Sequence, residues 1–203
     1  AVVAPGRKAL MLHGATASSG RAVNERSWFS VASVGKHFTA TAVLELAMRK
    51  RLNLSKPIGH YLTDVPEAWA GRCILSLLRH SSGLPEYLSA SPDEPVPDNR
   101  SNFMTRYAGL TPAFDEGAGW MYTNTNYILL GMLIAQVSGH NYADALQNLF
   151  GQIGCEGATV ASPSWARQAN ENESHTISRD LDSARREVIG DGDVCLTPAR
   201  ALI

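Results

Sequence analysis

The sequence predicts an α+β fold in which helix exceeds strand and the visible strands lie mainly near the N-terminus. Segments 8–12 and 28–32 are short apolar runs of the length typical of strands. Residues 33 to about 52 are apolar nearly all round, as expected of a helix buried on every side. Later apolar positions at 127–137 and 142–150 recur at helical spacing, so two further long helices are expected.

The remaining segments show helix ends, turns and loops. Residues 74–79 predict a short helix that stops before Gly83 and Pro85. Three prolines between residues 91 and 100 predict a surface loop. Gly139 is expected to end the helix over 127–137, and Asn141 to cap the next one. Residues 190–193 predict a turn that leads into the short run 194–196.

Composition and net charge exclude some classes of function. The 203 residues are 44% hydrophobic and 18% charged, which is ordinary globular composition for one domain or two interleaved lobes. A net charge of −1 with no run of lysine or arginine predicts no nucleic-acid partner. No apolar stretch is long enough to span a bilayer, so no transmembrane segment is expected.

Cysteine and histidine spacing gives no reason to expect a metal or another cofactor. The cysteines are odd in number and form no C-x-x-C, so each is expected to be a small buried hydrophobe: Cys73, Cys155 and Cys195. The histidines show no H-x-x-x-H spacing and are expected to be packing or surface residues: His13, His37, His60, His80, His140 and His175. The N-terminus shows no signal-peptide pattern, and an exported or a cytosolic location both stay open.

Ser33 and Lys36 form the first candidate site. Residues three apart on a helix share one face, so the lysine amine can reach the serine hydroxyl. Ser33 lies near a helix N-terminus, where free N–H groups favour developing negative charge. Burial makes a lysine a better proton acceptor. The pair predicts acyl transfer through a serine ester, although an ordinary N-cap serine and a snorkelling lysine would give the same letters.

Tyr122 and Asn124 form the second candidate pair. Two residues apart on an extended segment, a tyrosine hydroxyl and an asparagine amide can project to one side. They could move a proton and hydrogen-bond the lysine or a substrate carbonyl. The alternative is structural: Asn124 caps the following helix and Tyr122 packs at its edge.

Four segments in this order resemble the serine β-lactamase and penicillin-binding-protein superfamily, most of all its class C and family VIII esterase branch. They are S-V-G-K at 33–36, L-L-R-H-S-S-G-L-P at 77–85, Y-T-N at 122–124 followed by N-Y-I-L-L-G at 126–131, and G-D-G-D-V at 190–194. Asp193 stands where that family usually has glycine. The resemblance covers residues 8 to 200 and implies a β-lactamase/transpeptidase-like fold, with a helical lobe packed on an antiparallel sheet. It implies one domain over 1–203, with N-terminal strands at 8–32 and the helical lobe at about 33–186.

The resemblance also implies roles for the four candidate residues. Ser33 would be the nucleophile and Lys36 its proton acceptor. Tyr122 would protonate the leaving group, and Asn124 would hold the lysine and the substrate amide or carbonyl. The backbone N–H of Ser33 would supply one arm of the oxyanion hole. The substrate would be a small molecule or a peptidoglycan-like peptide: an ester, a β-lactam or a D-amino-acid amide. His80, in the family-like loop, would make a structural hydrogen bond.

One family motif has no counterpart. A Lys/His/Trp-x-Gly is expected on an edge strand after the Tyr-x-Asn segment. Only Trp69-Ala70-Gly71 has those letters, and it lies too early in the chain, in a segment expected to be a polar loop. The C-terminal strands of the family are also not expected here. A natural truncation, a cropped chain or an inactive remnant would each explain this. The rival to an enzyme is therefore a penicillin-binding-like module that binds without turnover.

A second hydrolase fold is disfavoured. The segment 31–35 nearly matches the nucleophile elbow of α/β-hydrolases, with His13-Gly14 as an oxyanion loop. That elbow requires a small residue where β-branched Val31 stands, because its turn is strained.

The sequence gives no indication of the oligomeric state.

Overall fold

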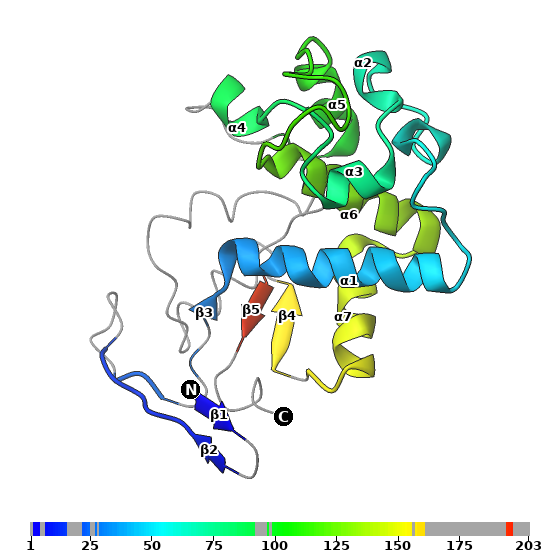
Figure 1. Ribbon diagram of the computed structural model, residues 1–203. Helices are drawn as coiled ribbons and strands as arrows, with labels where there is room; N and C mark the ends of the chain where they lie inside the picture. Colours follow the sequence, from blue (N-terminus) through cyan, green and yellow to red (C-terminus); the bar gives the residue numbers. More distant parts are fainter. Residues whose placement is uncertain are drawn as a thin grey trace. The chain divides into compact units, whose positions relative to one another are not determined.

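The computed structural model describes residues 2–4, 7–15, 22–24, 27, 29–91, 97, 99–155, 157–160 and 194–196 (Figure 1). They belong to two compact units. The first contains the chain up to Gly35, the end of helix α7 and the strands, and the second runs from Lys36 to Ala145.

The first unit contains a small antiparallel sheet. Its strands are β3 (Phe29–Ser30), β4 (Ala158–Val160) and β5 (Val194–Leu196), with β5 in the middle. Cys195 of β5 pairs with Ser30 on one side and with Thr159 on the other. The strand expected at 194–196 is confirmed, while the turn expected at 190–193 lies outside the described residues.

Both N-terminal strands are shorter than the sequence predicted. Strand β2 (Arg7–Ala9) pairs antiparallel with β1 (Val2–Ala4) and ends before the apolar residues Leu10 to Leu12. Met11 is 84% exposed, because no neighbouring strand covers it among the described residues. Of the strand predicted at 28–32, residues 29–30 form β3 and Ala32 already belongs to a helical turn, while Trp28 lies outside the described residues.

Helix α1 (Gly35–Met48) begins the second unit, and the prediction that it is buried on all sides was wrong. One face is covered, with Thr39 and Val43 fully buried, but Leu44 and Met48 on another face are exposed. Thr39 Oγ1 lies 2.7 Å from Tyr142 Oη, a buried hydrogen bond that ties α1 to α7 (Tyr142–Gln152). Apolar composition did not distinguish full burial from half burial, because exposed leucines and methionines are common in proteins.

Short helices follow α1: η2 (Ile58–His60), α2 (Glu67–Ala70), α3 (Ile74–Leu78), α4 (Tyr87–Ala90) and α5 (Arg100–Tyr107). The helix predicted at 74–79 is confirmed as α3, with Arg79 at its C-cap. Most of the loop predicted at 91–100 lies outside the described residues.

Helix α5 was not predicted. Asn99 caps it, because the Asn99 side chain accepts a hydrogen bond from the backbone N–H of Asn102 at 2.9 Å. Its face buries Phe103 and Tyr107, whose rings are 4.9 Å apart. Tyr87 of α4 completes this aromatic cluster, with its ring 5.3 Å from that of Phe103. The helix has only eight residues and directly follows a proline-rich segment, so its apolar pattern is a weak helix signal.

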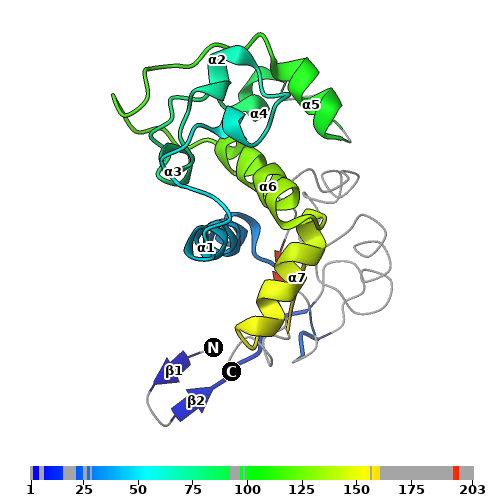
Figure 2. The same ribbon diagram turned by 90° about the vertical axis from the view of Figure 1, so that its right-hand side faces the viewer.

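Helix α6 (Asn124–Ser138) is the central helix of this unit, and it contacts α3 and α4 (Figures 1 and 2). Ten consecutive residues, 125–134, are buried. Gly139 ends α6 at φ +77°, a left-handed conformation that glycine adopts without strain. Asn141 Oδ1 accepts the backbone N–H of Asp144 at 2.8 Å, which confirms Asn141 as the cap of α7.

The cysteine prediction needs correction. Cys73 and Cys155 are free thiols with intermediate exposure, not fully buried residues. Burial raises the pKa of the Cys155 thiol, which keeps that sulfur protonated and weakly nucleophilic.

Gly83 lies at the most restrictive turn near α3. Its φ is +73°, and a Cβ added there would stand 2.0 Å from the carbonyl oxygen of Phe114. We therefore expect Gly83→Ala to lower the free energy of unfolding by at least about 2 kcal/mol, from backbone strain and overpacking together. Urea unfolding followed by circular dichroism measures this. Gly109→Ala is the matched control, because nothing lies within 4 Å of its added Cβ. Equal stability of the two variants would contradict the prediction.

Candidate active site

The start of α6 positions the Tyr-x-Asn segment. Thr123, not Asn124, is the N-cap of α6: the Thr123 side chain accepts the backbone N–H of Thr125 at 3.2 Å. Asn124 is the first helical residue, so the capping role considered for it in the sequence does not hold. Tyr122 precedes the cap and is 41% exposed. The cap at Thr123 thus fixes the start of α6 between the two candidates, with Tyr122 before the cap and Asn124 in the first turn.

The structure brings Lys36 and Tyr122 together. Lys36 is in the first turn of α1 and is only 7% exposed, as its predicted burial requires. Lys36 Nζ lies 5.4 Å from the ring centroid of Tyr122 and 5.6 Å from that of Tyr127 on α6. These are cation–π distances, each worth about 0.5–2 kcal/mol for a charged lysine. A buried amine beside a half-exposed phenol is an arrangement that can accept and pass on a proton.

His80 is a nearly buried residue that contacts the Tyr-x-Asn segment and the first turn of α6. Its ring lies 4.6 Å from the ring of Tyr122 and 5.1 Å from that of Tyr127. His80 Nδ1 accepts the backbone N–H of Thr123 at 3.3 Å and the side-chain amide of Asn126 at 3.2 Å. Two N–H donors on Nδ1 place the proton of the neutral ring on Nε2. The structural hydrogen bond expected of His80 is therefore confirmed.

The polar network around His80 is buried and continuous. Asn126 Oδ1 accepts the hydroxyl of Ser82 at 2.7 Å, and Ser82 Oγ in turn accepts the backbone N–H of Leu84 at 3.1 Å. Asn126 and Ser82 are fully buried, and His80 is 9% exposed. Loss of any member would leave a buried polar group unsatisfied, which is costly.

The pKa of His80 is lowered from its ordinary value, first by burial and second by the positive charge of Lys36. The folded protein therefore binds a proton on His80 less readily than the unfolded chain does. Stability from this residue is complete above the ordinary pKa of histidine, about 6.5, and is lost as the pH falls below it.

We expect His80→Asn to reduce the loss of stability between about pH 6.5 and pH 5. Asparagine suits the left-handed backbone at this position, where φ is +57°. Urea unfolding at several pH values compares the two slopes. His60→Asn is the control, since His60 lies outside this network. A variant slope as steep as that of the wild type would show that His80 does not carry the pH dependence.

Asn124 contacts a residue that the sequence did not single out. Glu86 Oε2 accepts the backbone N–H of Asn124 at 2.6 Å and its side-chain Nδ2 at 3.1 Å. Glu86 is also the N-cap of α4, where its Oε1 accepts the backbone N–H of Leu88 at 3.0 Å. The family-like segment 77–85 ends just before Glu86, so the resemblance did not include this residue. The one sequence signal for Glu86 is a side chain that can accept hydrogen bonds directly before a short helix.

Ser33 lies in a 3₁₀ turn, η1 (Ala32–Val34), directly before α1, and is exposed. This confirms its expected place at a helix start. The preceding Ala32 has φ +43°, a left-handed conformation that costs a residue with a Cβ about 1–2 kcal/mol. Such strain is found at functional positions more often than elsewhere.

The Trp-x-Gly candidate at 69–71 is not part of this site. Trp69 is fully buried in helix α2, and its Nε1 donates to the carbonyl oxygen of Leu110 at 2.8 Å. The expectation of a polar loop there was wrong, because the indole anchors a short helix. Residues 69–71 are still not the third family motif, because they precede the Tyr-x-Asn segment in the chain.

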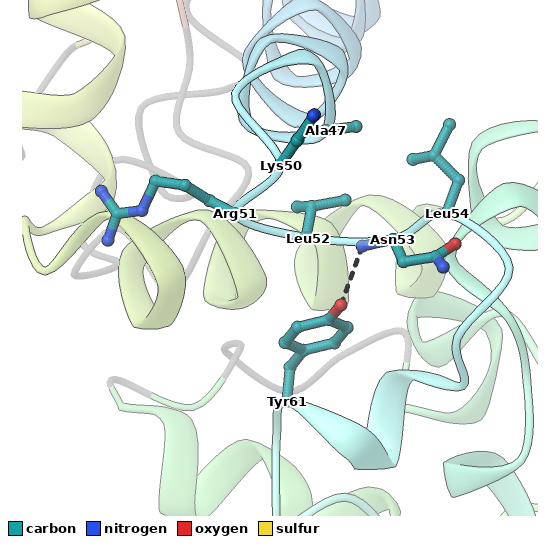
Figure 3. Close-up of a pocket in the computed structure, with 7 residues that line it drawn as sticks. All are labelled: Ala47, Lys50, Arg51, Leu52, Asn53, Leu54 and Tyr61. Atoms are coloured by element: carbon teal, nitrogen blue, oxygen red, sulfur yellow. Dashed lines mark hydrogen bonds between the residues drawn. The ribbon is translucent and has the colours of Figure 1, made fainter.

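A surface pocket of about 540 Å³ lies at the far end of α1 (Figure 3). Its lining residues are Ala47, Lys50, Arg51, Leu52, Asn53, Leu54 and Tyr61. Tyr61 Oη accepts the backbone N–H of Asn53 at 2.8 Å, whereas Arg51 extends away toward the carbonyl oxygen of Val137 (Figure 3). Lys36 and Lys50 are separated by the length of α1, about 20 Å at the helical rise. The pocket is therefore separate from the site around Lys36.

The described residues contain neither a membrane-spanning helix nor a metal-binding cluster. None of their helices is both long and apolar enough to cross a membrane. No group of three or more histidine, cysteine or acidic side chains in that part of the chain is arranged to hold a metal ion.

Known proteins resemble this chain in sequence and in structure. Penicillin-binding protein 4* of Bacillus subtilis (strain 168) is 31% identical over 137 residues, which are 63% of this chain and 29% of that protein. The structure of a penicillin-binding protein from Bacillus halodurans aligns with this chain at a TM-score of 0.74 and 22% identity. The alignment covers 93% of this chain and 62% of that protein's chain. A class C β-lactamase matches 89% of this chain and 50% of its own, with a TM-score of 0.69 and 22% identity.

A third solved structure is a D-amino acid amidase from Ochrobactrum anthropi SV3, with a TM-score of 0.67 and 26% identity. It covers 88% of this chain and 55% of its own. The chain thus spans about half to three fifths of these solved structures and less than a third of the curated relative. These matches confirm the β-lactamase/transpeptidase-like fold. The β-lactamase family model matches residues 1–193, and the chain therefore belongs to the β-lactamase family.

Proposed function

We propose that this chain is a serine hydrolase that acts through an acyl-enzyme, with Ser33, Lys36, Tyr122 and Asn124 as its catalytic residues. The observation that carries the proposal is the burial of Lys36 against the ring of Tyr122. A buried amine that contacts a phenol can accept a proton from a neighbouring hydroxyl, whereas the snorkelling lysine considered in the sequence would place its amine in solvent.

The reaction balances with these groups alone. Ser33 Oγ attacks the carbonyl carbon of the substrate while the uncharged form of Lys36 takes the hydroxyl proton. The tetrahedral oxyanion accepts the backbone N–H of Ser33. The bond to the leaving group then breaks as Tyr122 delivers a proton to it, and Lys36 returns a proton to the phenol. Water repeats the sequence on the ester to release the acid and free Ser33.

The substrate class is an ester, a β-lactam or a D-amino-acid amide. All three pass through the same acyl-serine, and the similar proteins include a β-lactamase, penicillin-binding proteins and a D-amino acid amidase. Fold alone does not choose among them, because specificity depends on the walls of the site.

Intact-protein mass spectrometry tests the proposal. The protein is incubated separately with benzylpenicillin, a p-nitrophenyl ester and a D-amino-acid amide, and the mass of the chain is followed with time. An added acyl mass on Ser33, transient or stable, is the expected result and identifies the preferred donor. A folded protein that gains no mass from any donor would favour the binding module without turnover.

A further inference from the structure

Hydrogen bonds join two short segments of the second unit, residues 85–87 and residues 123–125. Both threonine hydroxyls of the second segment donate to the carbonyl oxygen of Pro85, at 3.1 and 2.5 Å. The backbone N–H of Tyr87 donates to Thr125 Oγ1 at 3.1 Å. With the two bonds from Asn124 to Glu86, each of residues 123–125 is bound to a segment about 40 positions away in sequence.

The chemistry of Glu86 decides which way the Asn124 amide faces. A glutamate carboxylate at neutral pH only accepts hydrogen bonds, so the NH₂ end of the amide must be the end on Glu86. The contact therefore assigns Nδ2 to Glu86 at 3.1 Å and leaves Oδ1 as the opposite end. The amide cannot turn over without setting its oxygen against the carboxylate, which is repulsive.

An amide oxygen is what the rest of the proposed site needs. The ammonium form of Lys36 and the N–H of an amide substrate are both donors, and Oδ1 can accept from either. We propose that Glu86 is a positioning residue for catalysis, which holds Asn124 with Oδ1 available as an acceptor. The inference rests on the proposed function, because the acceptor matters only if Lys36 and substrate use it.

Glu86→Gln separates this role from a structural one. The variant side chain is the same size and keeps one oxygen, which can still cap α4 by accepting the backbone N–H of Leu88. In the orientation that keeps this cap, the new NH₂ group takes the place of Oε2 and faces both the side-chain amide and the backbone N–H of Asn124. The bond to the backbone N–H is then lost, and the reversed amide, with Oδ1 on the glutamine, is favoured. The cap is kept, the acceptor is withdrawn from the site, and the melting temperature reports what the lost backbone bond costs.

The experiment compares the wild type, Glu86→Gln and the matched control Glu116→Gln. Glu116 is also a glutamate that accepts a backbone N–H, that of Cys73 at 2.8 Å, and Cys73 belongs to neither of the two segments. The first readout is the burst of p-nitrophenolate as Ser33 is acylated by a p-nitrophenyl ester, with the melting temperature measured alongside. We expect Glu86→Gln to slow acylation about tenfold to a hundredfold, the scale of a hydrogen bond to a charged group, and Glu116→Gln to leave it unchanged.

The second readout does not depend on catalysis. The side-chain NH₂ signals of Asn124 in a ¹⁵N–¹H spectrum are assigned by their loss in Asn124→Asp, and they should shift in Glu86→Gln but not in Glu116→Gln. Wild-type acylation by Glu86→Gln, or a loss that disappears when the assay temperature is lowered further below the melting temperature, would overturn the positioning role. If the wild-type protein is never acylated, the proposed function fails by itself. Unshifted Asn124 signals in Glu86→Gln would then overturn the amide assignment, and shifted signals would uphold it.

Discussion

Ser33→Ala is expected to abolish acylation of the protein by every donor, because alanine offers no oxygen to attack the carbonyl. The expected loss is complete within detection, at least about 10⁴-fold, since a nucleophile that forms the covalent bond has no substitute. The fold should be unaffected, because Ser33 is exposed in its 3₁₀ turn. Intact-mass measurements of the acyl adduct give the result directly.

The control for Ser33→Ala is Ser55→Ala. Ser55 is another exposed serine, and it lies beyond the far end of α1. This control should be acylated as fast as the wild type. Persistent adduct on Ser33→Ala, localised elsewhere by peptide mapping, would remove Ser33 from the mechanism.

Lys36→Ala is expected to slow acylation at least about a hundredfold, the scale of a lost general base. Added alkylamine should restore part of the rate, since the deleted side chain leaves room beside the Tyr122 ring. The substitution also removes a positive charge that lowers the pKa of His80, so that pKa should rise. Stopped-flow acylation and a histidine NMR titration measure the two effects.

The two effects of Lys36→Ala have different meanings. An unchanged acylation rate together with a raised His80 pKa would leave Lys36 as an electrostatic neighbour with no role in proton transfer. Lys50→Ala serves as the control, because Lys50 is an exposed lysine at the other end of α1.

Local features were the ones that the sequence predicted well. The C-terminal stop at Gly139, the cap at Asn141 and the short helix α3 all depend on neighbouring residues, and the structure confirms each. The order of the four motifs likewise predicted the family, which the family model and the similar structures confirm. The catalytic roles of the four residues stay predictions until acylation is measured.

Long-range features could not be predicted from local patterns. Glu86 and Asn124 form a hydrogen bond although they are 38 positions apart in sequence, and the residue spacing within either segment does not predict that contact. The exposed side of α1 was missed for the same reason, since apolar residues do not reveal how many neighbours cover them. Helix α6, for which the sequence predicted only apolar positions at helical spacing, is buried through ten successive residues.

The burial of α6 has a consequence for how this protein could be altered by laboratory evolution. Tyr122 and Asn124 are built onto the start of a helix whose interior leaves no room for change, so substitutions behind them trade activity against folding. Ser33 instead belongs to a three-residue turn with no buried side chain. Libraries aimed at new acyl donors should therefore randomise the exposed neighbours of Ser33, such as Val34, and spare residues 125–134.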